Sequence, residues 1–408
     1  MAHLALRGGT PVRTEPFHPW PVYDDRDKQA LIRELEAGEW GIGSPSIDAF
    51  EKRFAEFCQA RHAVACTNGT DAILIGLQAL GVGAGDEVII PPYTFMATAV
   101  AVLMANAIPV FADIDPETYN IDPKSAEAKV TPRTKAIIPV HIAGNPADMD
   151  GILALAKKHA LKVLEDAAQA HGAAWKGRRV GALGDCGTFS FQTTKNLSSG
   201  EGGATVTDNE DLAEKLRSFT NCGRVRHGQW YEHHEVAGNH RLGGFQAALL
   251  LVGLERVEEQ MKRREENACY LAGLLNSVGG VKLAGTHKGA TRHVYHLGVL
   301  QYHPEDFKGL PKKRFIEAMQ KEGIECSSGY IPLYEFHFFQ HLAEKLSTYK
   351  ALYEGRGDYR SGICPVCERV CREEAVWLTQ NMFLGPKKDM EDIAEAIRKI
   401  KTHVDEAL

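Results

Sequence analysis

The most constraining feature of this 408-residue sequence is an alternation, between about residues 60 and 220, of short apolar runs with amphipathic stretches of helical length. The runs are rich in β-branched residues and are bounded by turn residues, which is typical of buried strands joined by crossover helices. We therefore expect an α/β domain with a mainly parallel sheet. The predicted strands are 63–66, 87–90, 108–112, 136–140, 161–164, 187–190 and 203–207, and the predicted crossover helices are 70–79, 96–105, 150–159 and 212–220.

The pattern changes in the second half of the chain. A long stretch rich in Gln, Glu and Leu, at about residues 243–275, indicates a helix that connects two domains. The segments after it mix strand-like and helical patterns, which indicates a smaller α+β domain. We place a large domain, including the N-terminal segment, at residues 1–255, and the connecting helix with the small C-terminal domain at residues 256–408. The segments of the small domain are a strand at 293–300 and helices at 312–322 and 390–404.

Composition and charge argue against several classes of function. Lys and Arg number 47 and Asp and Glu number 53, so the net charge of −6 offers no overall attraction for nucleic acid or for an anionic membrane. No apolar run reaches the roughly 18 residues that a membrane span needs, and the first residues lack the pattern of a secretory signal. We expect a cytoplasmic protein that binds neither nucleic acid nor membrane.

The nine cysteines are scattered and odd in number, which fits reduced thiols better than a disulfide framework. The spacing of Cys364, Cys367 and Cys371 resembles that of half a zinc site or of a redox motif. A structural zinc site needs a second ligand pair at matching spacing, and the sequence offers no good one. We interpret these residues as thiols of the small domain and predict no metal site.

Three segments that follow predicted strands carry polar groups suited to chemistry. Lys195 comes after the strand at 187–190, where a desolvated amine can attack a carbonyl carbon. Asp166 comes after the strand at 161–164, at the edge where open α/β sheets bind ligands. Gly69 and Thr70 begin a helix whose backbone N–H groups can seat a phosphate.

Each of these segments also has a structural interpretation when taken alone. Most lysines are solvated surface charges, Asp166 can cap the helix that follows it, and the turn at 67–71 can serve only for capping. Parallel strands end at one edge of a sheet, however, so the amine, the acid and the anion seat are predicted to share one site. A phosphorylated pyridine aldehyde requires all three.

The order of these segments, together with further motifs, resembles the DegT/DnrJ/EryC1/StrS family of pyridoxal-phosphate-dependent sugar aminotransferases. The resemblance covers most of the chain, from about Trp20 to the final helices. It implies a fold-type-I enzyme whose large domain has a mainly parallel, seven-stranded sheet and whose smaller C-terminal domain is α+β. The motifs are Asn68-Gly-Thr70, Pro92-Tyr-Thr-Phe-Met-Ala-Thr98, Glu165-Asp-Ala-Ala-Gln-Ala-His-Gly172, Phe189-Ser-Phe191 with Lys195, Gly200-Glu-Gly-Gly203 and Gly238-Asn-His-Arg-Leu242.

The resemblance implies a role for each matching residue. Lys195 would form the internal aldimine with pyridoxal 5'-phosphate and then act as acid and base, and Asp166 would keep the pyridine nitrogen protonated. Asn239 would reach the phosphate from the partner subunit, which implies a homodimer with shared active sites. The other implied cofactor contacts are Gly69, Thr70 and Ser190 to the phosphate, Phe95 stacked on the ring and Gln169 at the phenolic oxygen.

The reaction that the resemblance implies is transamination, with glutamate or glutamine as the amino donor and a keto-sugar or keto-cyclitol as the acceptor. The motif Phe17-His-Pro-Trp-Pro21 and similar stretches are nearest to members that act on cyclitols or make 3-amino-5-hydroxybenzoate. The alternative is therefore a lyase of the 3-amino-5-hydroxybenzoate synthase type, which aromatises its substrate by loss of water. Lys195 argues against the branch of the family that dehydrates sugars.

Two further residues have open interpretations. His141, after a predicted strand, is equally compatible with a substrate contact and with a hydrogen-bonded core histidine. Tyr330 either reaches the substrate from the small domain or packs within it, and packing is the more common role for such a residue.

Overall fold

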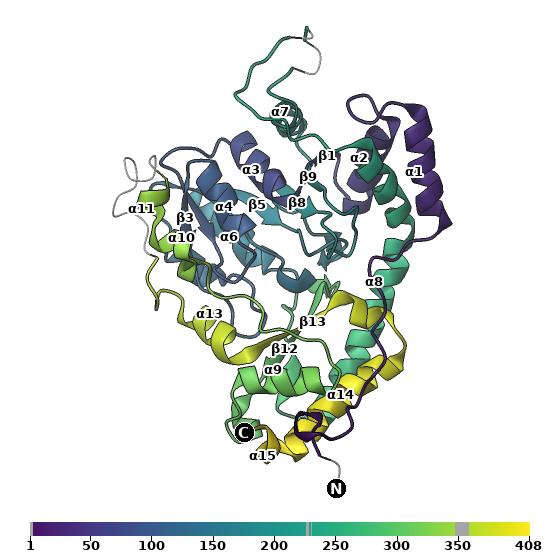
Figure 1. Ribbon diagram of the computed structural model, residues 1–408. Coiled ribbons are helices and arrows are strands. Elements are labelled where there is room, and N and C mark those ends of the chain that lie inside the picture. Colours follow the sequence, from purple (N-terminus) through teal and green to yellow (C-terminus); the bar gives the residue numbers. More distant parts are fainter. Residues whose placement is uncertain (1–2, 226–227, 230, 347–358) are drawn as a thin grey trace.

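The computed structural model describes residues 3–225, 228–229, 231–346 and 359–408 (Figure 1). The centre of its large domain is a seven-stranded sheet. The strands are β1 His62–Cys66, β2 Glu87–Ile90, β3 Ile108–Phe111, β4 Thr134–Ile137, β5 Lys162–Asp166, β8 Cys186–Ser190 and β9 Gly203–Thr207. Their order is β1-β9-β8-β5-β4-β2-β3. Strand β9 runs antiparallel to its neighbours β1 and β8, and the other neighbouring strands pair in parallel, which confirms the predicted mainly parallel sheet.

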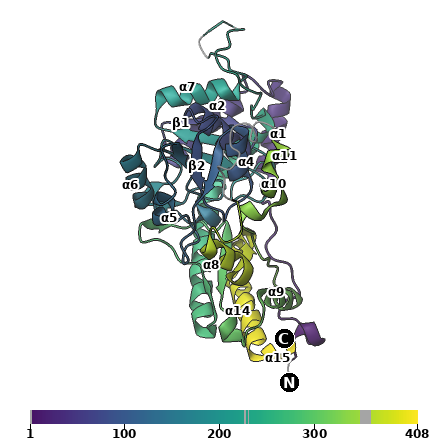
Figure 2. The same cartoon turned by 90° about the vertical axis from the view of Figure 1, so that its left-hand side faces the viewer.

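Helices cover both faces of this sheet. They are α1 Asp25–Ala37, α2 Pro45–Cys58, α3 Gly69–Ala79, α4 Ala97–Met104, α5 Pro123–Glu127, α6 Met149–His159 and α7 Glu210–Thr220. Successive strand residues point to opposite faces, so Val88 packs in the core beneath α3 and α4 while Ile89 packs in the core beneath α2 and α6. Figure 2 shows α6 and α4 on opposite sides of β2.

The predicted strands and crossover helices are all present, with small differences at their ends. The largest difference is at β4, which ends at Ile137 although the apolar run continues to residue 140. Pro139 lies within that run and has no N–H group to extend the ladder, so the regular pairing stops before it. The sequence interpretation did not identify α1 and α2, which precede the alternating region.

A single helix, α8 (Gly244–Val278), runs from the large domain into the small domain (Figure 1). The expected domain boundary between residues 255 and 256 falls inside this helix, and the division itself stays a prediction. The small domain has a three-stranded antiparallel sheet in the order β10-β12-β13. Its strands are β10 Val281–Leu283, β12 Leu297–Tyr302 and β13 Ala375–Thr379, and its helices are α9 Lys312–Lys321, α14 Lys387–Thr402 and α15 Val404–Ala407. The helices α10 His337–Gln340, α11 Leu342–Lys345 and α13 Pro365–Arg369 also follow α8 in the chain, but they pack in the core of the large domain.

A second small sheet joins the two domains. Its strands are β6 Ala174–Trp175, β7 Arg178–Arg179 and β11 Ala290–Arg292, in the order β11-β6-β7. None of the helices in the described ranges is long and apolar enough to cross a membrane.

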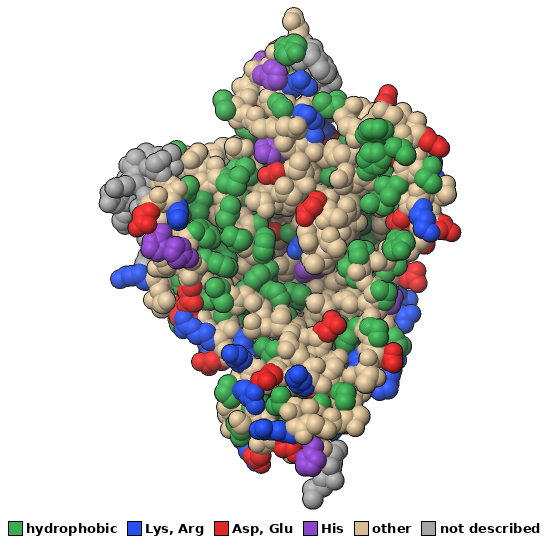
Figure 3. Space-filling model, viewed as in Figure 1, with side chains coloured by type: hydrophobic (Ala, Val, Ile, Leu, Met, Phe, Trp, Pro, Cys, Tyr) green, Lys and Arg blue, Asp and Glu red, His purple; other side chains and the backbone are tan. Residues whose placement is uncertain are grey.

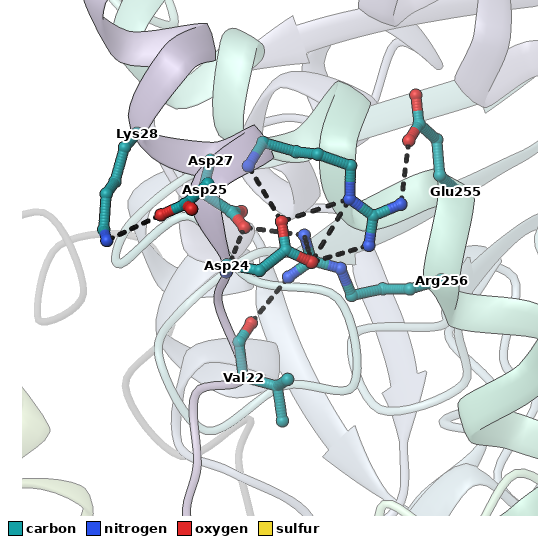
Figure 4. A network of polar contacts seen from close by, with 8 residues as sticks. Val22, Asp24, Asp25, Asp27, Lys28, Glu255 and Arg256 are labelled. Carbon is teal, nitrogen blue, oxygen red and sulfur yellow. Dashed lines mark hydrogen bonds and ion pairs between the residues drawn. The ribbon is translucent and has the colours of Figure 1, made fainter.

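The N-terminal arm is anchored to α8 by a network of charged groups (Figure 4). Arg256 of α8 donates to the carbonyl oxygen of Val22 over 2.7 Å and pairs with the carboxylate of Asp27 over 2.6 Å. Asp24 caps α1 by accepting from the N–H of Arg26. Farther along the same arm, Arg13 pairs with two carboxylates of α14. The arm therefore ties α1 and both domains together, and the two ends of the chain lie at the same end of the molecule (Figure 1).

A fully buried carboxylate fixes the end of β5, where the candidate site begins. The Oε1 atom of Glu165 accepts from the N–H groups of Leu183 and Gly184, and its Oε2 atom accepts from that of Gly181. His141 lies 3.0 Å from Oε2 through Nε2, and its Nδ1 accepts from the N–H of Ala147. Since Nδ1 is an acceptor, Nε2 carries the proton that is donated to Glu165. The structure therefore identifies His141 as a hydrogen-bonded core residue.

Replacing this carboxylate with an amide is expected to destabilise the large domain. In Glu165→Gln an N–H₂ group would face donors, so we expect the free energy of unfolding in urea to fall by about 3 kcal/mol. Glu117→Gln, at an exposed ion pair with Lys282, is the control and should change it by less than about 0.5 kcal/mol. Equal effects of the two substitutions would contradict this interpretation of the network.

Candidate active site

The predicted site residues come from strand ends at one edge of the central sheet. Asp166 ends β5, Ser190 ends β8, and the loop after β8 carries Lys195. Gly69 and Thr70 begin α3, directly after β1 and its short turn. Because β1, β8 and β5 all point the same way, their carboxyl ends lie at the same edge.

Asp166 is a buried acid whose two oxygens are only partly satisfied. Its Oδ2 accepts from the hydroxyl of Thr98 over 2.8 Å, and its Oδ1 accepts from the N–H of Ala168 over 3.2 Å. Burial raises the pKa of Asp166, while these hydrogen bonds and the charge of Lys195 act in the opposite direction. No ion pair involves Asp166 in the described part of the chain. A cationic N–H group brought to this carboxylate would supply the missing charge partner.

Lys195 lies in the loop that follows β8, and its amine makes no hydrogen bond or ion pair with the described residues. Burial lowers its pKa to about 8, and the nearby charge of Asp166 raises it in part. The loop is held on both sides: the Lys195 N–H donates to the Gln192 carbonyl, and the indole of Trp20 donates to the Thr193 carbonyl over 2.7 Å. The structure therefore presents a desolvated amine on a fixed loop, near a carboxylate.

The start of α3 forms an anion seat beside the end of β8. Asn68 caps the helix by accepting from the N–H of Asp71, which leaves the N–H groups of Gly69 and Thr70 without a protein acceptor in the described ranges. A Cβ atom at Gly69 would lie 2.7 Å from Cβ of Ser190, so only glycine permits this close approach. Two backbone donors and the Ser190 hydroxyl thus face the same space, as a phosphate requires.

Gln169 and Phe95 lie around the same edge. The Oε1 atom of Gln169 accepts from the N–H of Ala143 over 2.7 Å, and its Nε2 donates to the hydroxyl of Tyr330 over 3.1 Å. Phe95 stands one turn before Thr98, the residue that bonds to Asp166. Phe95 is 54% exposed, which is unusual for a phenylalanine beside a buried acid.

Asn239 stands apart from this group. Its side-chain oxygen accepts from the N–H of Arg241, and no hydrogen bond joins it to the other predicted site residues in the described ranges. The next residue, His240, accepts from the N–H of Thr67 through its carbonyl and pairs with Asp71. Asn239 therefore lies on an exposed segment that is docked beside the start of α3.

The structure adds residues that the sequence interpretation did not assign to the site. Thr98 is fully buried and bonds to Asp166, and Ala143 presents its N–H to Gln169 from a left-handed backbone conformation with φ of 59°. Trp20 joins the N-terminal arm to the Lys195 loop. Thr98 and Trp20 had a signal in the sequence, since each belongs to a motif of the family resemblance. The Ala143 contact depends on backbone geometry.

The cysteine cluster packs in the core of the large domain and not in that of the small domain, where the sequence interpretation placed it. Cys364, Cys367 and Cys371 are buried, and the last two sulfurs lie 3.8 Å apart. Burial, with the charge of Asp113, raises the pKa of Cys364 to about 12 and that of Cys367 well above its usual value. Such thiols stay protonated near neutral pH and are poor nucleophiles and ligands. Among the described residues, no group of three or more His, Cys, Asp or Glu side chains is arranged to hold a metal ion.

The arrangement fits a phosphorylated pyridine aldehyde. A ring whose nitrogen is protonated would satisfy the buried Asp166 carboxylate, its phosphate would occupy the α3 seat, and its aldehyde carbon would be in reach of an amine with a lowered pKa. A planar ring would also cover the exposed side chain of Phe95. No residue of this set conflicts with such a group.

Comparison with known proteins agrees with this chemistry. A model of the DegT/DnrJ/EryC1/StrS aminotransferase family matches residues 22–382. A Streptoalloteichus tenebrarius protein, named as a candidate L-glutamine:3-amino-2,3-dideoxy-scyllo-inosose aminotransferase, is 40% identical over 99% of both chains. The L-glutamine:2-deoxy-scyllo-inosose aminotransferase of the same organism is 38% identical over 98% of both chains.

The fold is shared with solved structures. The structure of 3-amino-5-hydroxybenzoic acid synthase has a TM-score of 0.83 and 35% sequence identity, and the match covers 95% of this chain and 98% of that one. The chain therefore has the fold-type-I architecture that its motifs predict.

The lowered pKa of Lys195 gives a testable pH dependence. In cofactor-free protein, only the neutral amine reacts with an acylating reagent, so acylation of Lys195 should reach half its maximal rate near pH 8. The carboxylate of Asp166 raises this pKa, so Asp166→Asn should move the midpoint to lower pH. Peptide mass spectrometry would follow the reaction, with the exposed Lys262 as the internal control. A midpoint equal to that of Lys262, or an upward shift in Asp166→Asn, would contradict the assigned environment.

Proposed function

Because this chain belongs to the DegT/DnrJ/EryC1/StrS aminotransferase family, we propose that it carries an amino group from glutamine or glutamate to the carbonyl carbon of a keto-cyclitol or keto-sugar. Aminotransferases of this family depend on pyridoxal phosphate, and so does this chain. The observation that carries the proposal is the meeting of a desolvated amine, a buried acid and an anion seat at one edge of the sheet. When bound, the cofactor supplies an electron sink for the carbanion that forms beside the transferred nitrogen.

Lys195 has two tasks in this proposal. Its Nζ would hold the cofactor's aldehyde carbon in the resting enzyme, and as a free amine it would accept and return the proton at the reacting carbon. A pKa of about 8 leaves an appreciable neutral fraction near neutral pH, which both tasks require. The fixed loop around Lys195 keeps Nζ in position between the two tasks.

The other residues orient the cofactor and set its charge. Asp166 would hold a proton on the ring nitrogen through charge attraction in a buried setting, and Thr98 holds that carboxylate in place. Phe95 would stack on the ring, and Gln169 would donate to the phenolic oxygen. The N–H groups at the start of α3 would bind the phosphate together with Ser190.

A cyclitol ketone is the acceptor that the relatives favour. Two relatives over nearly the whole chain are named for glutamine as donor and for inosose acceptors, which are cyclic polyol ketones. A second candidate is the lyase reaction that forms an aromatic amine, supported by the 35% identity to 3-amino-5-hydroxybenzoic acid synthase. Both functions would use the same lysine-bound cofactor, but only transamination consumes an amino donor, because loss of water needs none.

A half-reaction experiment separates these functions. The purified enzyme with L-glutamine should lose the absorbance of the lysine-bound cofactor and accumulate its aminated form. Addition of a keto-cyclitol should restore the first spectrum and give an amino-cyclitol without an aromatic product. In Lys195→Arg the guanidinium stays charged at neutral pH and cannot bond to the aldehyde. Donor turnover should therefore fall by about three orders of magnitude or more. An aromatic product would favour the lyase, and a donor that leaves the spectrum unchanged would contradict transamination.

Surface features of the single chain support the proposed homodimer. The described part of the loop between α7 and α8 projects beyond the rest of the molecule (Figure 1), and Val236 and Tyr231 in this loop are 98% and 82% exposed. An open cavity of about 380 Å³ lies between its base and the start of α2. Figure 3 shows hydrophobic side chains gathered on the side of the molecule that faces the viewer, below the projecting loop. Such a pattern marks an interaction surface. A second copy of the chain would cover them and receive the projecting loop, at whose base Asn239 lies.

Subunit mixing tests whether Asn239 serves the partner's site. Lys195→Ala and Asn239→Ala should each lower activity strongly as homodimers. If Asn239 acts across the interface, each mixed dimer regains one intact site, so remixing equal amounts should restore about a quarter of wild-type activity. Activity that stays at the mean of the two variants would place Asn239 in its own chain's site.

A further inference from the structure

The amide of Gln169 has a defined orientation. A backbone N–H can only donate, so the atom that faces the N–H of Ala143 at 2.7 Å is the amide oxygen. The amide nitrogen therefore faces the hydroxyl of Tyr330 at 3.1 Å, and the Tyr330 oxygen is the acceptor. One N–H of Gln169 is held in this way, and its second N–H is left to donate to a ligand.

The two partners of Gln169 come from different domains. Ala143 lies in the short helical turn Ile142–Gly144 of the large domain, and its left-handed conformation, with φ of 59°, points its N–H at the amide. Tyr330 lies in the small domain, in the loop between α9 and α10. The Gln169 side chain is thus held by two contacts from distant parts of the chain.

Tyr330 is itself fixed by aromatic packing. Its ring meets Trp377 of β13 edge-on, with centroids 4.5 Å apart, and Tyr93 at 5.6 Å. The indole of Trp377 donates to the hydroxyl of Tyr93 over 2.8 Å, which locks the two outer rings. Gly329, with φ of 74°, lies so close to Trp377 that a Cβ atom there would come within 2.6 Å of the indole. The backbone beside Tyr330 is therefore packed directly on this ring.

We propose that Tyr330 is a positioning residue, which orients the Gln169 amide so that its second N–H points at the phenolic oxygen of the cofactor. This inference rests on the proposed function and adds a residue of the small domain to the control of the cofactor. The Tyr330 hydroxyl and the Ala143 N–H together prevent rotation of the amide. Without the hydroxyl, the amide nitrogen has no fixed partner and its donation to the cofactor weakens.

The charge on the phenolic oxygen makes this role measurable. A hydrogen bond to that oxygen withdraws electron density from it and lowers the proton affinity of the nitrogen that joins the cofactor to Lys195. A weaker hydrogen bond therefore raises the pKa of that nitrogen. This protonation changes the visible spectrum, so a pH titration of the resting enzyme reads the orientation of Gln169 without any turnover.

The experiment compares the spectroscopic titration of four variants with that of the wild-type holoenzyme. Tyr330→Phe should raise the titration midpoint by about one pH unit, since hydrogen bonds to charged groups have that order of effect. Gln169→Leu should raise it by at least as much. Addition of Tyr330→Phe to Gln169→Leu should cause no further change. Tyr302→Phe removes a buried hydroxyl that bonds to the Leu310 carbonyl in the small-domain core and should leave the midpoint unchanged.

Two results would overturn the inference. One is a midpoint in Tyr330→Phe equal to that of the wild type, and the other is an equal shift from Tyr330→Phe with and without Gln169, which would mean that Tyr330 acts by another route. A wild-type protein that binds no cofactor at Lys195 would instead contradict the proposed function itself. Cofactor content and the spectrum of the wild type separate that failure from the first two.

Discussion

The site depends on the desolvation of two opposite charges that are near each other but not paired. Burial lowers the pKa of Lys195 to about 8 and raises that of Asp166, which means that it destabilises the charged form of each side chain. No direct ion pair between the two offsets this destabilisation in the described part of the chain. The surrounding structure maintains this separation. Thr98 holds the carboxylate, the turn at Gln192 holds the lysine backbone, and the Glu165 network fixes the strand end between them.

The fold places this pair where a ligand can complete it. Parallel strands bring their carboxyl ends to one edge, and the same edge carries the unpaired N–H groups at the start of α3. An anion at α3 and a cation at Asp166 are what the site lacks, and one zwitterionic cofactor supplies both. The small domain and the N-terminal arm then close the site from the other side, through the Tyr330 contact to Gln169 and the Trp20 contact to Thr193.

Much of this arrangement follows from the sequence because it depends on local patterns. The seven strands have a clear apolar pattern, and Asp166 and Ser190 occupy strand ends that the pattern defines. The sequence pattern does not identify the N-terminal helices, since α1 and α2 are stabilised by contacts with α8 from far along the chain. The role of Tyr330 is not defined by the sequence for a similar reason, because its partner Gln169 is 161 residues away. The left-handed turn at Ala143 has no glycine to signal it.

The most direct test of the central claim is to find where the cofactor is bonded. Reduction of the purified holoenzyme with borohydride makes the carbon–nitrogen bond permanent, and digestion followed by mass spectrometry locates it. A single pyridoxyl label on the peptide that contains Lys195 is the predicted result. A label on another lysine, or no label on a protein that retains its fold, would contradict the assignment of the site.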